Sequence, residues 1–415
     1  MRRVVVTGIG TLTPIGNDVK SFTEALKNGV SGANIITRFD ATNFKTKFAC
    51  EIKDFDPELR VDKKESRRMD HFAQYAMYAA DEAMEMAGLD LEKIDLDMAG
   101  VIWGSGIGGL RSLENEISDF VKGSGTPRHN PFLIPRMITD IAAGYISIKY
   151  GFRGINYATV SACASSTHAI NNATDYIRLG KANVMICGGS EAAVTTSGVG
   201  GFNAMKALSE RNDDYLTASR PFDRDRDGFV LGEGGAALVL EDYEHAKKRG
   251  AHIIAEIAGG GMTADAHHIT APHPEGLGAM KVMQIALKDA GMNPEDVDYV
   301  NMHGTSTPLG DIAETKAVMK VFGEHIYNMN LSSTKSMTGH LLGAAGAIEA
   351  ICGILAIRDG FIPPTINHFT DDPELDPKIN FTFNQAQEKK VKVILSNTFG
   401  FGGHNSSVIV KAFED

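Results

Sequence analysis

A repeated pattern of strand, small-residue turn and helix decides the fold, and it is clearest in INYATVSACASSTHAINNATDYIRLGKANVMIC, residues 155–187. Residues 155–160 predict a short strand that runs into the turn Ser161-Ala162-Cys163. A helix is predicted from there to Leu179, where Gly180 suits the left-handed position that ends a helix. Residues 184–187 predict another buried strand, so strands and helices alternate, as in an α/β fold.

The same pattern recurs along the chain. Strands are predicted at 4–8, 99–103, 299–302, 331–334, 393–397 and 407–410, and helices at 18–27, at 311–322 and from near His340 onward. The last two strands flank the turn Gly400-Phe401-Gly402-Gly403. This recurrence predicts two similar halves, residues 1–250 and 251–415, although no sequence repeat has a fixed period.

Composition narrows the class of protein. The 415 residues carry a formal net charge of −11, which argues against a general nucleic-acid binder. Four cysteines without paired spacing fit neither a zinc site nor a disulfide scaffold, and they favour a reducing cytosol. The longest apolar stretch, 341–357, includes Glu349 and is shorter than the roughly 20 residues of a membrane span, so we expect a buried helix and no membrane association.

Cys163 is the strongest candidate for a reactive group. Most free cysteines are small buried hydrophobic residues. Cys163, however, lies among small residues at a strand-to-helix corner, where a substrate has room and the positive end of the helix is expected to lower the thiol pKa. Cys50, Cys187 and Cys352 lack this context.

Two histidines also follow predicted strands, in His303-Gly304-Thr305-Ser306-Thr307 and in Lys335-Ser336-Met337-Thr338-Gly339-His340. Imidazole NH groups can hold an oxyanion or move a proton at neutral pH. Either histidine alone would suit a structural role, but together with a nucleophilic Cys163 they favour a catalytic role. Lys335 is either a surface cation or a group that fixes the charge and orientation of His340.

Two other motifs carry weaker signals. Residues 104–109, GSGIGG, match a dinucleotide-binding fingerprint, but no strand with a terminal acid follows at the expected distance. His267, His268 and His273 with Asp265 suggest a metal site, but their turn-prone segment favours ordinary loop histidines.

At these residues the sequence resembles the β-ketoacyl-acyl carrier protein synthases, the elongating condensing enzymes of the thiolase superfamily. The resemblance spans nearly the whole chain and includes residues 4–8, 161–163, 220–223, 227–229, both histidine motifs and 397–405. Residues 64–70 make it most similar to the type II synthases. One departure is His404, where the family often has Thr.

The resemblance implies a duplicated, five-layered α-β-α-β-α fold and a condensation between an acyl group on Cys163 and malonyl-acyl carrier protein, which releases CO2. The backbone NH groups of Cys163 and Phe401 would hold the tetrahedral oxyanion, and His303 and His340 would hold the enolate. Phe401 would also gate the acyl pocket. The resemblance further places Thr305, Thr307, Thr270 and Phe399 beside the substrate, with Ile107 and Phe202 in the wall of the acyl pocket.

The same resemblance implies a cytoplasmic homodimer that uses no organic cofactor. A structural monovalent cation would lie near Asn301, Glu349, Ser396 and Asn397. Docking of the acidic carrier protein would use Lys63, Lys64, Arg67, Arg68 and Lys206, for which a solvated helix face is the alternative.

Three other functions stay open on the sequence: a polyketide condensing subunit of the same fold, a non-catalytic partner subunit and a nucleotide-dependent oxidoreductase. The Cys-His-His set disfavours the second. Chain-length preference is not readable from the sequence.

Overall fold

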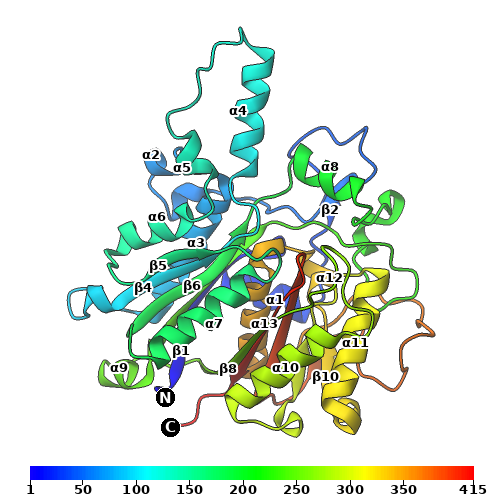
Figure 1. Ribbon diagram of the computed structural model, residues 1–415. Helices are drawn as coiled ribbons and strands as arrows, with labels where there is room; N and C mark the ends of the chain where they lie inside the picture. Colours follow the sequence, from blue (N-terminus) through cyan, green and yellow to red (C-terminus); the bar gives the residue numbers. More distant parts are fainter.

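A computed structural model describes residues 1–415, and one ten-stranded sheet forms its centre (Figure 1). The spatial order of the strands is β10-β9-β13-β14-β8-β1-β7-β6-β4-β5. Their bounds are β1 Val4–Leu12, β4 Ala99–Gly104, β5 Asn156–Thr159, β6 Val184–Glu191, β7 Gly234–Asp242, β8 Ala255–Ala264, β9 Tyr299–Asn301, β10 Asn330–Ser332, β13 Val393–Gly400 and β14 His404–Lys411. Two small sheets pair β2 Asn34–Ile35 with β3 Phe48–Ala49, and β11 Phe361–Ile362 with β12 Gln387–Glu388.

The large sheet contains the same five-strand arrangement twice. In each half the spatial order, counted along the chain, is third, second, fourth, fifth, first: β5-β4-β6-β7-β1 in one half and β10-β9-β13-β14-β8 in the other. A short antiparallel pairing of Val4–Val6 with residues 255–257 joins the halves. The structure therefore has the internal duplication that a thiolase-like fold requires, while the proposed boundary at residue 250 stays a prediction.

Helices add three layers to the two half-sheets. Those of the N-terminal half are α1 Val19–Lys27, α2 Lys63–Ser66, α3 His71–Ala87, α4 Leu110–Lys122, α5 Leu133–Met137, α6 Ile141–Tyr150, α7 Ser165–Arg178, α8 Thr196–Ala204 and α9 Tyr243–Lys248. Those that follow are α10 Leu277–Ala290, α11 Pro308–Phe322, α12 Lys335–Thr338 and α13 Ala345–Asp359.

The central layer consists of α7 and α13, each of which packs against strands of both halves. Helix α3 covers the outer face of β1, β7 and β6, and α10 covers β8 and β14. The core reflects this order: α13 is buried through its first twelve residues, and Figure 1 shows it surrounded by other elements. The five layers predicted from the family resemblance are thus present.

Most predicted elements are found within a few residues of their expected ends, and Gly180 has the expected left-handed φ of 71°. The exception is the helix predicted to begin near His340. Left-handed backbone at Gly339, with φ 69°, and at Leu342, with φ 48°, interrupts the chain there. His340 consequently lies in a loop between α12 and α13, and only residues 345–359 form the long buried helix.

Candidate active site

Cys163 lies at the start of helix α7, after a sharp turn in the backbone. Ala162 has φ 51°, a left-handed value that non-glycine residues rarely adopt, and Ala164 is the N-cap of the helix. The helix therefore presents its positive end to the sulfur. Only 8% of Cys163 is exposed, whereas Cys50, Cys187 and Cys352 are at most 1% exposed. Among the four cysteines, only Cys163 lines either of the two main cavities.

The side chain of His340 contacts the sulfur directly. Its Nε2 lies 3.0 Å from Cys163 Sγ, and its ring packs edge-on against Phe229. The backbone on both sides is fixed, because the NH of His340 donates to the Val230 carbonyl and the NH of Gly232 donates to the His340 carbonyl. The geometry permits proton exchange between thiol and imidazole.

His303 stands next to His340, with ring centroids 5.4 Å apart and ring planes at 87°. Its position depends on Glu314, in the second turn of α11. The NH groups of His303 and Gly304 donate to the two carboxylate oxygens of Glu314, each at 2.8 Å. Glu314 is thus a structural anchor for the His303 loop.

Burial sets the protonation of these groups. It lowers the pKa of both His303 and His340 well below the usual value, and the nearby Lys335 ammonium lowers both further, so both imidazoles are neutral at neutral pH. The predicted lowering of the thiol pKa is wrong: burial raises the pKa of Cys163 to about 12, although Lys335 opposes the shift. Desolvation by the surrounding groups outweighs the favourable position at the helix end.

Lys335 is not a surface cation. It is 1% exposed and forms an ion pair with the carboxylate of Glu349, on α13. Burial raises the pKa of Glu349 to about 7, and Lys335 opposes that rise. The ammonium group of Lys335 is close enough to the two histidines to disfavour a positive charge on either imidazole.

The turn between β13 and β14 closes the site from the other side. The backbone NH of Phe401 bonds to Cys163 Sγ, and Gly400 packs so closely that a Cβ there would lie 3.0 Å from the Cys163 nitrogen. Phe401 itself is half-buried. The Phe401 NH therefore lies beside the sulfur, and the adjacent Gly400 packs against the backbone of Cys163.

A cavity of about 740 Å³ opens onto these groups. It brings together most of the residues predicted for catalysis and substrate binding: Cys163, His303, His340, Phe401, Thr305, Thr307, Thr270, Phe399, Ile107 and Phe202. Lys206, predicted for carrier docking, lines the same cavity. The structure also places Phe229, Leu342 and Glu314 in the lining. The cavity is largely apolar around Ile107, Phe202 and Phe229, and polar around the threonines.

The four basic residues of the 63–68 segment lie elsewhere. Lys63, Lys64, Arg67 and Arg68 are exposed on and just after α2, where the Arg68 guanidinium lies 5.0 Å from the ring of Phe132. Lys206 follows α8, on the other side of α4 in Figure 1. Within one chain the five residues thus form two basic regions rather than one patch.

The residues predicted for a cation show an unusual set of unsatisfied oxygens. Asn301 Oδ1, Glu349 Oε2 and Ser396 Oγ are buried and have no hydrogen-bond partner. Asn301 and Ser396 are paired residues of adjacent parallel strands. The Asn397 side chain is used elsewhere, because its Oδ1 accepts from Ser407 and its Nδ2 donates to Glu314. Three of the four residues therefore fit a hard cation.

The glycine-rich segment 104–109 does not offer a free site for a phosphate. The carboxylate of Glu191 occupies the turn and accepts from the NH groups of Gly106 and Ile107, at 2.7 and 3.2 Å. In the other weak motif, His268 Nδ1 accepts from the NH groups of Thr270 and Ala271 and thereby shapes its own loop. No group of three or more His, Cys, Asp or Glu side chains is arranged to hold a metal ion.

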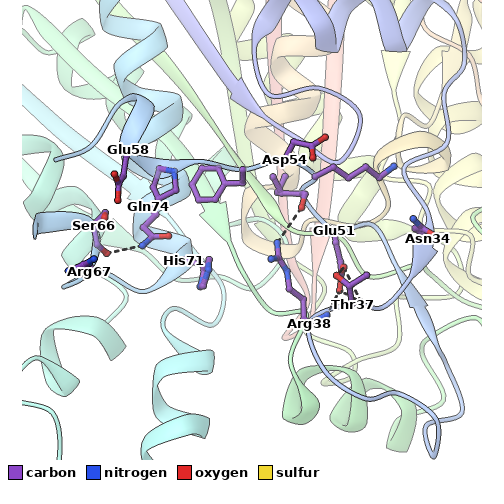
Figure 2. A pocket seen from close by; sticks show the side chains of 14 residues that line it. Asn34, Thr37, Arg38, Glu51, Asp54, Glu58, Ser66, Arg67, His71 and Gln74 are labelled. Carbon is purple, nitrogen blue, oxygen red and sulfur yellow. Dashed lines mark hydrogen bonds between the residues drawn. The ribbon is translucent and has the colours of Figure 1, made fainter. Parts of the chain in front are cut away.

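A second cavity, of about 650 Å³, lies between the 34–58 segment and the start of α3 (Figure 2). Its polar side chains mostly bond to their own surroundings: Glu51 accepts from Thr37, Arg38 pairs with Glu233, and Gln74 donates to the Ser66 carbonyl. It contains no cysteine, and none of the predicted catalytic residues lines it. Of the two cavities, only the one at Cys163 contains residues predicted for catalysis.

Sequence reasoning missed the two buried carboxylates, Glu191 and Glu314. Acidic residues are normally exposed, and both of these bond to backbone NH groups, which leave no pattern in a sequence. The one available signal was the spacing of Asp311 and Glu314, which places both acids on one face of a helix.

A duplicated five-layer fold with a cysteine and two neutral histidines in one cavity defines a thiolase-like condensing enzyme. Two family models match the chain: the beta-ketoacyl synthase N-terminal domain over residues 1–246 and the C-terminal domain over residues 254–369. The chain belongs to the beta-ketoacyl synthases.

Curated relatives agree along the whole chain. The 3-oxoacyl-[acyl-carrier-protein] synthase 2 of Coxiella burnetii is 48% identical over 100% of this chain and 99% of its own length, and that of Staphylococcus aureus strain MRSA252 is 50% identical over 99% of each. Among solved structures, a beta-ketoacyl synthase from Burkholderia phymatum has a TM-score of 0.92 and 36% identity, with both chains fully covered. A ketosynthase/chain length factor named for ishigamide has a TM-score of 0.92 and 34% identity, also over both whole chains.

These similarities confirm the resemblance found in the sequence. The chain is an acyltransferase of the ketosynthase type that functions in fatty acid elongation. The polyketide alternative is less well supported, since identity to the ishigamide protein is 34%, against 48–50% for the synthase 2 relatives. No helix of the structure combines the length and the apolar character needed to cross a membrane.

Proposed function

We propose that this beta-ketoacyl synthase carries its growing acyl chain on Cys163 and extends it with a malonyl group delivered by acyl carrier protein. The observation that supports this role is the 3.0 Å contact between Cys163 Sγ and His340 Nε2, inside a cavity that also contains His303. The products are 3-oxoacyl-carrier protein and CO2.

In the first half-reaction the Cys163 sulfur attacks the thioester carbonyl of the acyl-carrier protein. The thiol proton passes to His340 and then to the departing phosphopantetheine sulfur, so no net charge is left in the site. The NH groups of Cys163 and Phe401 donate to the tetrahedral oxyanion. The result is a covalent acyl-enzyme and free carrier protein.

In the second half-reaction malonyl-carrier protein loses CO2, and the electrons of the broken bond form an enolate. The neutral rings of His303 and His340 donate NH groups to the enolate oxygen. Its carbon attacks the acyl-Cys163 carbonyl, a carbon-carbon bond forms, and the Cys163 thiolate leaves and takes up one proton from solvent, which is the proton that the overall reaction consumes. Decarboxylation supplies the carbanion, so a strong base is not required.

Cys163→Ala tests this scheme. The variant should form no acyl adduct and no 3-oxoacyl product, whereas slow malonyl decarboxylation should persist on the two histidines. Intact-protein mass spectrometry and CO2 release measure these outcomes, with the deeply buried Cys187→Ala as the control. An acyl adduct on the Cys163→Ala protein would refute the assignment.

The cavity lining suggests how the substrate lies. Thr305 and Thr307, whose hydroxyls are 3.1 Å apart, and Thr270 are the polar residues for the pantetheine arm. Phe399 packs on His303 at 5.6 Å between ring centroids and borders the same arm. Ile107 and Phe202 line the apolar end, where the acyl chain would extend, and Phe401 stands between the two parts.

Carrier-protein docking would use the two basic regions, Lys63, Lys64, Arg67 and Arg68 around α2, and Lys206 at the mouth of the cavity. One solved relative, with a TM-score of 0.91 and 33% identity over both whole chains, is a type II polyketide ketosynthase in complex with its acyl-carrier protein. The enzyme has a net charge of −11, so an acidic carrier protein would be attracted only to its basic regions, and these two regions would therefore position the carrier.

A homodimer is supported by exposed apolar side chains near an open sheet edge. Strand β5 is the terminal strand of its half, and Val160 just after it is 61% exposed. Ile117 and Val121 on α4 and Ile134 on α5 are also exposed, and Figure 1 shows α4 projecting from the body of the chain. A second copy would cover these groups.

Sedimentation should show that the wild-type protein is a dimer, and Ile134→Asp should weaken the dimer. A monomeric wild-type protein would contradict the proposal.

A structural monovalent cation between Asn301, Glu349 and Ser396 would satisfy their three unpartnered oxygens. Its role would be to hold the segments behind the histidines together, without contact with substrate. The melting temperature should rise with K⁺ or Na⁺ compared with a bulky organic cation at equal ionic strength. Asn301→Ala should abolish this difference, and an equal response to all cations would contradict the site.

We also propose that the protein is located in the reducing cytoplasm. All four of its cysteines are free and buried, which agrees with this location.

A further inference from the structure

Glu191, at the end of β6, is a fully buried carboxylate that none of the proposed catalytic steps uses. It is 0% exposed and ends a strand that lies inside the sheet, between β7 and β4. No Lys, Arg or His side chain is among the groups that bond to it. A buried charge without a counter-ion is costly and needs a full set of hydrogen-bond donors.

Four donors surround the carboxylate, and they are divided evenly between its oxygens. Oε1 accepts from the Ser105 hydroxyl at 3.1 Å and from the Ile107 NH at 3.2 Å. Oε2 accepts from the Gly106 NH at 2.7 Å and from the Gly343 NH at 3.1 Å. Ser105 also accepts from the Gly108 NH through its hydroxyl, so the whole turn after β4 is tied to this one side chain.

These donors belong to two segments that both border the acyl cavity and pack against each other, since a Cβ on Gly343 would lie 2.3 Å from the Gly106 nitrogen. Ile107 lines the cavity from the β4 turn, and Leu342 lines it from the segment next to Gly343. Little regular structure holds these parts: Ile107 is in a loop, and Leu342, with a left-handed φ of 48°, begins a 3₁₀ turn of only three residues. The packing is close as well, since a Cβ on Gly106 would lie 3.0 Å from Glu191 Oε2.

We propose that Glu191 is a positioning residue that sets the width of the acyl pocket by fixing Ile107 and Leu342 against each other. The inference rests on the proposed function, because it assumes that this end of the cavity receives the acyl chain. Glu191 acts through its four donors and touches neither the substrate nor the reacting sulfur. It would therefore control which acyl chains are accepted rather than the chemistry of decarboxylation.

Glu191→Gln is an informative substitution because an amide has only one acceptor oxygen. If its oxygen faces Gly106 and Gly343, its NH2 group faces Ser105 and Ile107. The Ser105 hydroxyl can rotate and accept, but the Ile107 NH cannot and loses its partner. The opposite orientation leaves two backbone NH groups unpaired. The variant should therefore release the Ile107 turn and keep the Gly343 side in place.

The experiment compares wild type and Glu191→Gln in two measurements. Amide hydrogen exchange of residues 105–108 should become faster in the variant. With a ladder of acyl-carrier proteins, the ratio of acylation kcat/KM between the best and the worst chain should fall about tenfold, the effect of one lost buried hydrogen bond. A uniform loss for all chain lengths, unchanged exchange, or a wild-type profile with no chain-length preference would overturn the proposal.

Two further variants keep the outcome interpretable. Glu241→Gln changes an equally buried carboxylate beside the opposite end of β6, and it should alter stability without altering the shape of the chain-length profile. Ser105→Ala removes only one donor and should produce the same flattening to a smaller extent, which covers the case that Glu191→Gln does not fold. If wild type itself formed no adduct on Cys163, the proposed catalytic roles would fail, independently of Glu191.

Discussion

Desolvation decides the charge of each reacting side chain in this cavity. It raises the pKa of the Cys163 thiol to about 12 and lowers the pKa of His303 and His340 well below the usual value. The resting pair at 3.0 Å is therefore a neutral thiol and a neutral imidazole rather than an ion pair. In the proposed mechanism, thiolate character would therefore develop only as the sulfur attacks the substrate.

His303 should be needed for one half-reaction only. Replacing it with Ala removes a donor to the enolate oxygen but leaves the Cys163–His340 contact, so decarboxylation should fall by about 10²–10³, as for loss of an oxyanion donor. Acyl-enzyme formation should persist. CO2 release from malonyl-carrier protein and intact mass measure the two steps. Equal decarboxylation rates with and without His303 would remove it from the mechanism.

His71 gives the chain a pH-dependent stability outside the active site. Burial, with Arg111 and Arg38 nearby, lowers its pKa to about 3. Below pH 6.5 the unfolded chain binds a proton at this residue and the native protein does not, so its contribution to stability falls as pH falls.

His71→Gln removes this titration. Relative to the variant, wild type should lose up to about 1.4 kcal/mol of unfolding free energy per pH unit between about pH 6 and 4. Urea unfolding at several pH values measures the difference, and His252→Gln at an exposed position is the control. A stability difference that stays constant across this range would contradict the assignment.

The sequence alone was sufficient to find candidate catalytic residues of a reactive type, cysteine and histidine, that follow the end of a strand. Cys163, His303 and His340 each follow a predicted strand, and the structure brings all three into one cavity. The direction of the thiol pKa shift was not predictable, because it depends on how completely other segments exclude water. Glu191 and Glu314 were missed because their partners are backbone NH groups, which every residue but proline possesses.

At the scale of elements, the contact between α7 and α13 aligns the reacting groups. Cys163 stands at the start of α7, and His340 comes shortly before α13. The two helices meet where Gly346 packs against Thr167, whose Oγ1 accepts from Thr398 at 2.7 Å. A side chain at position 346 would overlap Thr167 Oγ1.

Gly346→Ala should therefore separate the helices. Overpacking of this kind costs about 1–3 kcal/mol. The acylation rate should fall by up to about 10², because a displacement of about 1 Å is enough to disturb the sulfur–imidazole geometry. Thermal unfolding and acyl-enzyme formation measure the two effects. Gly201→Ala, on α8 with open space around the added methyl group, is the matched control and should not destabilise the protein. Unchanged acylation in Gly346→Ala would show that this contact does not align the site.

Many helices and strands could be predicted from sequence patterns. Strands and helices with clear periodicity and glycine ends, such as α7 with Gly180, were predicted within a few residues. The helix expected at His340 failed because left-handed backbone at a non-glycine residue, Leu342, depends on tertiary packing.

At the scale of the whole molecule, the proposed docking sets local positive charge against a net charge of −11. Toward the acidic carrier that the family resemblance implies, overall electrostatics would oppose the encounter, and the two basic regions would overcome this locally. Because α2 and Lys206 lie in different places, each region can be tested separately.

Arg68→Glu and Lys206→Glu should each raise the KM for carrier-bound substrate by about tenfold and make it less sensitive to salt. Values of kcat should change little, since neither residue contacts the reacting atoms. Lys248→Glu on α9 introduces the same charge change at a remote exposed position and serves as the control. If KM responds equally to all three reversals, net charge rather than local docking is responsible.

The repeated strand order has a consequence for how this active site is composed. Cys163 follows the third strand of one half and His340 the third strand of the other, so the nucleophile and its imidazole occupy corresponding loops of a duplicated unit. The loop of His303 likewise corresponds to the loop of Ile107, and each is tied by its NH groups to a buried glutamate, Glu314 or Glu191. In the first pair both loops contribute to the proposed chemistry, whereas in the second pair one loop holds His303 and the other holds Ile107, in the wall of the proposed acyl pocket.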